Sequence, residues 1–290
     1  MGAWRLADNA WIELAPGHKM GLTVTNPVLL AGGVVGYGEA TPRGVDLAQL
    51  GGVVVGPITR QSRRGQPPPR LAETVGGFVL GTGGQNRGVS AAVKKFARLW
   101  PRLGCPVIAQ LADTQPEDAQ VTAARLQATN ALAGLELLLP QDASPVQLRG
   151  LVQAVRRGSD LPLWLKLPLE QATLLAPAAE EAGADGLVIG QPPRGAGLRP
   201  GPDGQAQQVE GGVHGPLTFA LMLQALTQVA ALDLPLALIA CGGIHTAAQA
   251  RQALSAGARA LQVDSAAWVE PELPLWLARA LARSQEAGKA

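Results

Sequence analysis

The stretch LPLWLKLPLEQATLLAPAAEEAGADGLVI, residues 161–189, contains the pattern that decides the fold. It begins with an apolar run, LPLWLKL, continues through an alanine- and leucine-rich segment, and ends with a second apolar run, GLVI. Short continuous apolar runs are typical of strands buried on both faces, whereas longer segments with apolar residues three or four positions apart are typical of helices. The stretch therefore predicts a strand, a helix and a second strand.

The same unit recurs along the chain. Segments with helical spacing separate eight apolar runs, at residues 27–31, 52–55, 106–111, 134–139, 161–167, 186–189, 236–240 and 260–263. Strands buried on both faces pair in parallel, and eight such strands joined by helices close into a barrel. We therefore predict a single (β/α)8 TIM barrel domain over residues 1–290, with an N-terminal extension at 1–21, a barrel core at 22–268 and a C-terminal helix at 269–290.

Capping residues and glycines mark the expected helix boundaries. A Ser or Thr followed three residues later by Glu or Gln is the signature of a helix N-terminus. It occurs at Thr114 with Glu117, Ser144 with Gln147, and Thr246 with Gln249. The turn Ala-Gly-Ala occurs at 182–184 and again at 256–258, where glycine can adopt the left-handed conformation that ends a helix.

Two long segments rich in glycine and proline lack helical spacing. Residues 56–88 follow the second predicted strand, and residues 190–215 follow the sixth. Long loops without a helical pattern are either functional lids or mobile surface segments. Because barrel enzymes build their sites at the carboxyl ends of the strands, where both loops begin, the first interpretation places them over a site.

The composition excludes several classes of partner. The 290 residues include 24 basic and 22 acidic ones, a formal net charge of +2, and like charges form no long run. Neither nucleic acid nor an anionic membrane is therefore expected as a partner, and no window is apolar enough to span a bilayer. Cys105 and Cys241 lie far apart in apolar contexts, which favours free thiols and a cytoplasmic location. No spacing of His, Cys and carboxylates predicts a metal site.

Lys166 is the most conspicuous titratable residue, because it lies inside the apolar run 161–167. An ammonium group is costly to bury unless it meets an anion or a polar cofactor. Either Lys166 points into a site at the carboxyl end of its strand, or its side chain extends from the strand end to solvent.

Glycines near the last strands are a second signal. The pair at 211–212 with Gly215 precedes a predicted helix, and Gly242 with Gly243 ends the seventh strand. Backbone amides at helix N-termini bind anions, and barrels place phosphate groups near strands seven and eight. The alternative is a tight turn that simply requires glycine. His214, between these glycines, either contacts an anion or is solvated.

The segment GQPPPRLAET, residues 65–74, is the most specific of a series of pieces that match one family. The others are 26–31, 36–38, 76–77, 85–86, 164–167, 182–186, 211–212, 215–216, 242–244 and 262–263. Together they resemble the dihydroorotate dehydrogenases, FMN-dependent (β/α)8 barrels, and within them the form that pairs with an iron–sulfur electron-transfer subunit. The resemblance spans about Leu22 to Trp268.

The resemblance implies an oxidoreductase of pyrimidine biosynthesis. In that family a base removes a proton from the substrate ring while hydride passes to flavin N5, and the electrons leave through the partner subunit. The residues that match the family's FMN contacts are Gly32, Lys166, Gly215, Gly242, Gly243 and Ser265. The residues at its substrate contacts are Gln85, Asn86 and Gln191. The resemblance also implies a homodimer.

Several family positions hold other residue types in this chain. The lysine that ends the family's second strand is Gly56, and its catalytic base after strand four is Gln141, which takes no proton usefully at neutral pH. Asp142, the next residue, is a candidate for a displaced base. The asparagines at the substrate are replaced by Leu80 and Gln191.

A further change, on strand eight, bears on the cofactor. Asp264 stands where the family has a glycine whose amide meets the phosphate, and its carboxylate would repel a phosphate dianion. Two hypotheses stay open. The chain is a flavoprotein that retains FMN and acts on dihydroorotate or a related substrate, or it is a catalytically degenerate homologue that serves as a binding or assembly subunit. A third, a different phosphate-binding barrel synthase, gives residues 65–74 no role.

Overall fold

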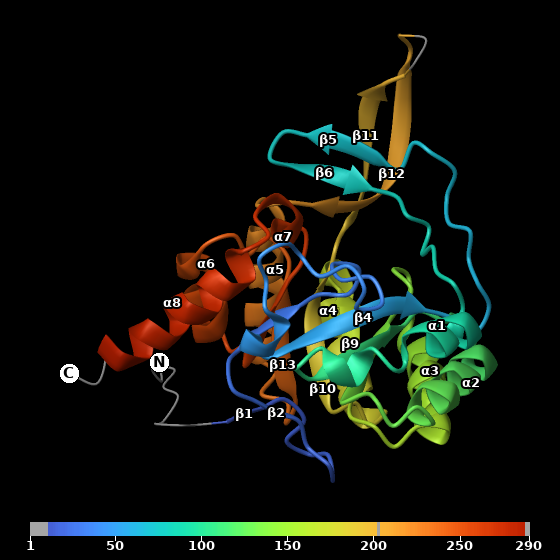
Figure 1. Cartoon of the computed structure of the whole chain (residues 1–290), viewed down its shortest axis with the longest axis vertical. Coiled ribbons are helices and arrows are strands. Elements are labelled where there is room, and N and C mark those ends of the chain that lie inside the picture. Colours follow the sequence, from blue (N-terminus) through green and yellow to red (C-terminus); the bar gives the residue numbers. More distant parts are fainter. Residues whose placement is uncertain (1–10, 202–203, 288–290) are drawn as a thin grey trace.

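A closed barrel of eight parallel strands forms the centre of the protein (Figure 1). The structure is a computed structural model that describes residues 11–201 and 204–287. In barrel order the strands are β3 (Val28–Leu30), β4 (Gly52–Ile58), β7 (Val107–Leu111), β8 (Gly134–Leu138), β9 (Leu163–Pro168), β10 (Gly186–Gln191), β13 (Ala237–Cys241) and β14 (Ala260–Val263). The last strand pairs with the first, Leu261 opposite Val28. The predicted barrel and all eight predicted strands are confirmed.

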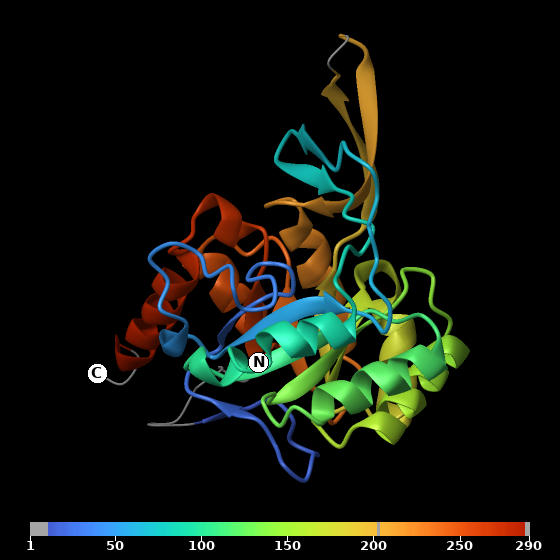
Figure 2. The same cartoon turned by 45° about the vertical axis from the view of Figure 1, so that its right-hand side comes forward.

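Helices surround the barrel and cover its outer face (Figure 2). They are α1 (Val89–Phe96), α2 (Pro116–Gln127), α3 (Pro145–Gly158), α4 (Ala172–Glu181), α5 (Thr218–Ala230), α6 (Ala247–Ser255), α7 (Ala266–Val269) and α8 (Leu273–Ala287), with short 3-10 turns at Leu47–Gln49, Trp100–Arg102 and Leu169–Gln171. In α3 the buried side chains include Leu148, Leu151, Val152 and Val155, the spacing that places one apolar stripe against the strands.

Two of the three predicted capping boxes are confirmed. Ser144 and Thr246 each accept the backbone N–H three residues on. The prediction for Thr114 is wrong: α2 begins at Pro116, after Gln115, and no side chain caps it. The fixed φ of proline suits the first helical position, so Pro116 sets the start two residues beyond Thr114. At the Ala-Gly-Ala turns, Gly183 and Gly257 have φ of 90° and 113°, as expected for helix ends.

Trp164 closes the amino-terminal end of the barrel. Its buried indole Nε1 donates a hydrogen bond to the Leu14 carbonyl (2.8 Å), in the loop between β1 (Ile12–Glu13) and β2 (Thr23–Val24). Gly134 and Gly186, on the two neighbouring strands, leave room for the ring, since a Cβ at either position would lie within 2.5 Å of it. Trp164 therefore fills the interior at this end of the barrel.

The long connections after the second and sixth barrel strands pair with each other, which the sequence did not predict. They form a four-stranded antiparallel sheet of β11 (Arg194–Pro200), β12 (Ala206–His214), β6 (Gly77–Leu80) and β5 (Leu71–Thr74), in that order. Figures 1 and 2 show this added sheet projecting from the barrel. The central pairing joins Gly212 to Leu80, residues far apart in the chain, so local patterning carries little signal of it.

The two ends of the chain lie outside the barrel strands. Residues 1–10 of the expected N-terminal extension lie outside the described residues, and α8 lies within the segment expected to form a C-terminal helix. In the described part of the chain, no helix combines the length and the apolar character needed to cross a bilayer.

Candidate functional site

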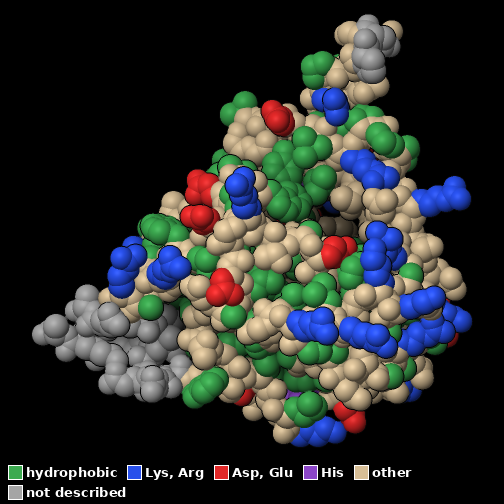
Figure 3. Space-filling model, in the orientation of Figure 1, with side chains coloured by type: hydrophobic (Ala, Val, Ile, Leu, Met, Phe, Trp, Pro, Cys, Tyr) green, Lys and Arg blue, Asp and Glu red, His purple; other side chains and the backbone are tan. Residues whose placement is uncertain are grey.

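A pocket of about 460 Å³ opens at the carboxyl ends of the barrel strands, beneath the added sheet. Figure 3 shows the molecule hollowed below this sheet. Small-molecule sites have volumes in this range and occur at this end of TIM barrels. Of the predicted site residues, those that line the pocket are Gly32, Gln85, Gln141, Lys166 and Gln191. Asp264, Leu80 and His214 also line it.

Lys166 is buried at the base of this pocket, with 4% of its surface exposed. Its Nζ donates hydrogen bonds to Cys241 Sγ (3.2 Å) and to Gln262 Oε1 (3.0 Å), and it lies 3.9 Å from Glu136 Oε1. These partners come from β13, β14 and β8, three separate strands of the barrel. The alternative in which the side chain extends to solvent is therefore excluded, and the cation is held inside the barrel.

Glu136 is the counter-charge, and it was missed at the sequence level. Its Oε1 accepts a hydrogen bond from Gln110 Nε2 (2.7 Å), and its Oε2 accepts one from Gln262 Nε2 (2.5 Å). We call Gln110, Glu136, Lys166, Cys241 and Gln262 the polar layer. A signal was present in the sequence, because a glutamate inside the apolar run 134–139 is as costly to bury unpaired as a lysine in the run 161–167.

Charge in the polar layer is fixed at neutral pH. Burial alone would lower the pKa of Lys166, but the charges of Glu136 and Asp264 and the hydrogen bond to Cys241 raise it above the usual 10.5. Burial also raises the pKa of Cys241 to about 12, so the group beside the ammonium is a neutral thiol. The negative charge that holds the ammonium is therefore that of the carboxylates.

His214 and Asp264 form a second polar pair in the pocket wall. His214 Nδ1 and Asp264 Oδ2 lie 3.0 Å apart, and their side chains are 11% and 16% exposed. The imidazole stacks on Phe78, with ring centroids 5.3 Å apart, and Phe78 stacks in turn on Trp268. His214 is therefore neither solvated nor free; it is positioned by a carboxylate on one edge and an aromatic face.

The Asp264 carboxylate is ionised. Burial would raise its pKa, but the hydrogen bond and charge of His214, the charge of Lys166 and a hydrogen bond from the backbone N–H of Ser265 together lower it. A carboxylate that accepts hydrogen bonds in its charged form keeps that form. A fixed negative charge therefore stands at the end of β14.

The backbone conformation by itself favours glycine at the positions after β12 and β13. Gly215, Gly242 and Gly243 all have φ in the left-handed region, at 126°, 112° and 69°. A Cβ at Gly243 would lie 2.2 Å from the Phe219 backbone nitrogen, so the turn requires glycine there. At Gly242 the nearest atom to a Cβ is 3.6 Å away, which leaves space on that side of the turn. A role for these glycines in holding phosphate stays a prediction.

The remaining predicted residues separate into two groups. Gln191 is 7% exposed and lines the pocket; its Nε2 donates to the Leu139 carbonyl, and its buried Oε1 has no partner. Gln141 also lines the pocket, and its Nε2 donates to the Pro192 carbonyl (2.9 Å). Asn86 lies outside the lining, where its Oδ1 accepts from the Gly88 N–H and fixes the loop. Asp142 is exposed and also lies outside the lining.

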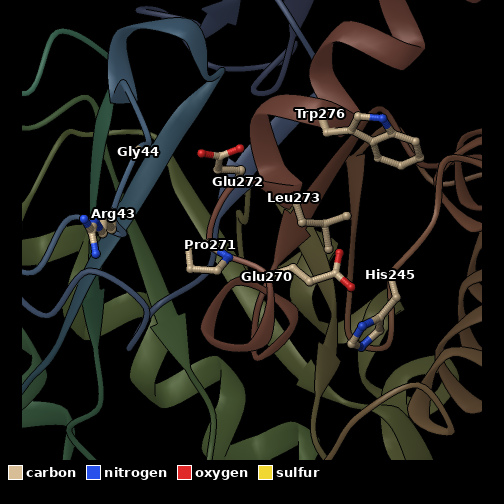
Figure 4. A pocket seen from close by; sticks show the side chains of 8 residues that line it. All are labelled: Arg43, Gly44, His245, Glu270, Pro271, Glu272, Leu273 and Trp276. Carbon is tan, nitrogen blue, oxygen red and sulfur yellow. The ribbon is translucent and has the colours of Figure 1, made fainter.

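A second hollow, of about 840 Å³, lies between the turn at 43–44 and the start of α8 (Figure 4). Figure 4 shows Glu270 and His245 on one side of it and Arg43 on the other. Burial lowers the pKa of His245, against the opposing charge of Glu270. This hollow shares no lining residue with the strand-end pocket and holds none of the predicted site residues. Within 11–201 and 204–287, no cluster of three or more His, Cys, Asp or Glu is placed to hold a metal ion.

Comparisons with known proteins decide the family. The family model for dihydroorotate dehydrogenase matches residues 17–282. A relative from Desulforudis audaxviator, "Dihydroorotate dehydrogenase B (NAD(+)), catalytic subunit", is 36% identical over 273 residues, covering 87% of this chain and 86% of that protein. The chain belongs to the dihydroorotate dehydrogenase family.

Further dihydroorotate dehydrogenase relatives agree with this assignment. A "Putative dihydroorotate dehydrogenase A (fumarate)" from Solibacter usitatus is 33% identical over 292 residues, covering 92% of this chain and 91% of that protein. The crystal structure of the Eimeria tenella dihydroorotate dehydrogenase in complex with ferulenol has a TM-score of 0.77 and 19% identity, covering 96% of this chain and 85% of that one. At that identity the likeness supports the fold.

The pocket fits the ring of the flavin that the dihydroorotate dehydrogenase resemblance implies. The polar layer presents a cation at the base of the pocket, which can stabilise electron density on a reduced ring. At Gly33, which also lines the pocket, no atom lies within 4 Å of a Cβ position, so space is open there.

The strand-eight end of the pocket does not fit the phosphate of FMN. Barrels bind phosphate at the loops after strands seven and eight, and the ionised Asp264 carboxylate stands at the second of these, where it would repel a phosphate dianion.

Proposed function

We propose that this chain is a flavin-dependent oxidoreductase that oxidises dihydroorotate, or a related small ring compound, by hydride transfer to the flavin. The observation that carries the proposal is Lys166, a buried cation at the base of the strand-end pocket, held by Gln262 and Cys241. The names of the relatives support dihydroorotate as the substrate class. A bound flavin would supply the hydride acceptor.

Two residues of the chain have distinct roles in this proposal. Lys166, charged at neutral pH, would stabilise the negative charge that arises when a flavin ring is reduced, and Glu136 keeps it charged and in place.

Removal of the proton from dihydroorotate lacks an obvious general base at the expected position in this chain. Gln141 is an amide that takes no proton at neutral pH, and its Nε2 is bound to the Pro192 carbonyl. Asp142 is exposed and outside the pocket lining. General acid–base catalysis typically contributes about 10²–10⁴ in rate. We therefore propose that dihydroorotate is oxidised slowly unless a related ring with a more acidic proton is the true substrate.

We further propose that the electrons leave through a second subunit that carries an iron–sulfur centre. Relatives such as the one from Maridesulfovibrio salexigens, 32% identical over 289 residues, bear the name "catalytic subunit", which supports a partner chain. A homodimer of this chain remains part of the same proposal.

The test is an absorbance spectrum of the purified full-length chain, before and after incubation with riboflavin or FMN. We expect flavin bands displaced from those of free flavin, and slow bleaching of these bands when dihydroorotate is added without oxygen. The matched control is Lys166→Met, which should bind flavin but bleach more slowly still. A protein that stays colourless with both flavins would refute the proposed function.

A further inference from the structure

We propose that the Asp264 carboxylate occupies the position at the end of strand eight where barrel enzymes bind a phosphate. The flavin that this chain binds would then be one without a phosphate, whose side chain ends in hydroxyl groups. The inference rests on the proposed function, which makes the chain a flavin-binding protein, and it specifies which flavin. Three observations carry it: the place of Asp264 in the barrel, the donors that it already uses, and the charge of the pocket wall.

Asp264 stands where a phosphate-binding backbone would be needed. It is the first residue after β14 and lines the strand-end pocket. A backbone that binds phosphate at such a strand end approaches the anion closely and offers free N–H groups. At this strand end the Asp264 side chain occupies the space that the anion would need.

The imidazole beside Asp264 is already taken by its carboxylate. His214 Nδ1 and Asp264 Oδ2 lie 3.0 Å apart, at hydrogen-bonding distance. His214 comes from the end of β12, which reaches the start of α7 in Figures 1 and 2. A phosphate arriving at this end of the pocket would have to displace the carboxylate from the imidazole.

The pair is held in place, so Asp264 is not free to turn away. The His214 ring stacks on Phe78 at an interplanar angle of 9°, and Phe78 stacks on Trp268, in α7 just after Asp264. The side chains of His214 and Asp264 are 11% and 16% exposed. Moving the carboxylate toward solvent would leave the imidazole without its partner in a mostly buried site.

The pocket wall offers no second lysine or arginine for a phosphate. Among the described residues that line it, Lys166 is the one lysine or arginine. Its charge is already matched by Glu136, 3.9 Å away. Phosphate sites in proteins are typically built from arginine or lysine side chains together with free N–H groups, and the lining supplies no second such side chain. A hydroxyl group, in contrast, donates a hydrogen bond to a carboxylate without adding negative charge.

The experiment compares two flavins that differ only in the phosphate. The full-length chain, freed of any bound flavin, is titrated at pH 7.5 with riboflavin and with FMN, and binding is followed by quenching of flavin fluorescence. At this pH the phosphate is close to a dianion. We expect riboflavin to bind at least roughly tenfold more tightly than FMN.

Two variants and a control make the test specific. In Asp264→Asn the charge is removed and the size kept, so the affinity for FMN should rise by roughly tenfold while that for riboflavin changes little. The double variant Asp264→Gly with His214→Ser should do the same if the single variant unfolds. Glu270→Gln removes one negative charge from the second hollow and should change neither affinity.

The outcomes separate the two proposals. The proposal that the Asp264 carboxylate takes the place of the phosphate would be refuted if the unmodified chain bound FMN more tightly than riboflavin. It would also be refuted if Asp264→Asn raised the affinity for both flavins equally. Either result would leave the proposed function standing. Binding of neither flavin by the unmodified chain and by the variants would overturn the proposed function itself.

Discussion

Replacing Lys166 by methionine should destabilise the barrel by about 3–5 kcal/mol, the usual cost of breaking a buried charge pair from one side. Methionine keeps an unbranched side chain of similar length, so packing changes little. The charge is lost, however, and Glu136 stays buried with 1% of its side chain exposed. The perturbation therefore tests whether the polar layer is a coupled unit.

The magnitude follows from the distances. Lys166 Nζ and Glu136 Oε1 lie 3.9 Å apart, and two unit charges at that distance attract by about 4 kcal/mol at an effective dielectric constant of about 20. Methionine also leaves Gln262 Oε1 without its donor. At about 2.1 cal/mol/K per residue, the entropy of unfolding of a 290-residue chain is about 0.6 kcal/mol/K, so the unfolding midpoint should fall by about 5–8 °C.

The assay is thermal unfolding followed by circular dichroism, on the unmodified chain, Lys166→Met, Glu136→Gln and the double variant. The double variant removes both charges, so its loss should be smaller than the sum of the two single losses by about 2 kcal/mol or more. Additive losses, or a Lys166→Met variant within 1 kcal/mol of the unmodified chain, would show that the charges are not coupled.

The contribution of Lys166 to stability should also depend on pH in a defined direction. The pKa of Lys166 is raised above 10.5 in the folded state. Its contribution is therefore fully present below about pH 10.5 and is lost only as pH rises through the folded value. The deficit of Lys166→Met should be constant between pH 7 and pH 9.5.

Three further predictions concern the caps, the thiols and the strand-eight carboxylate. Ser144→Ala should lower stability by about 1 kcal/mol in denaturant unfolding because it removes a capping box, whereas Thr114→Ala, a residue that caps no helix, should change it by less than about 0.5 kcal/mol. A chromogenic disulfide reagent at pH 7.5 should label neither cysteine of the folded chain rapidly, since burial raises the pKa of Cys105 to about 11 and that of Cys241 to about 12; fast labelling before unfolding would contradict this. Asp264→Asn should lower stability at pH 7 and at pH 5 alike, and the loss of stability should shrink only below about pH 4. The reason is that the folded pKa of this carboxyl is depressed, so its contribution to stability is lost as pH falls through that value. A loss of stability that disappears already between pH 7 and pH 5 would argue for another group.

Local patterns were sufficient for the barrel. Each strand run is continuous and apolar because both of its faces are buried, and each capping box is a signal over four residues. Such features need no knowledge of distant partners, so the eight strands and the caps at Ser144 and Thr246 could be predicted. Thr114 failed for a local reason as well, the proline two residues later.

The added sheet could not be predicted, because its pairing joins segments that are remote in sequence. Leu80 pairs with Gly212, and the composition of both segments resembles that of loops. Glycine there serves close contact between strands: a Cβ at Gly211 would lie 2.1 Å from the Leu80 carbonyl oxygen. The same residues that suggested mobile loops are the ones that allow the strands to approach.

By itself, the sequence determined the barrel, the position of the pocket at its carboxyl end and the presence of a costly lysine within a strand. Only the tertiary structure decided what that lysine meets. Glu136 and Lys166 lie on neighbouring strands, but Gln262, which connects them, is 96 residues beyond the lysine. Likewise, His214 reaches Asp264 across 50 residues. Charges in an apolar interior must be paired, and barrel closure, which sets strand neighbours irrespective of their separation along the chain, determines the partners.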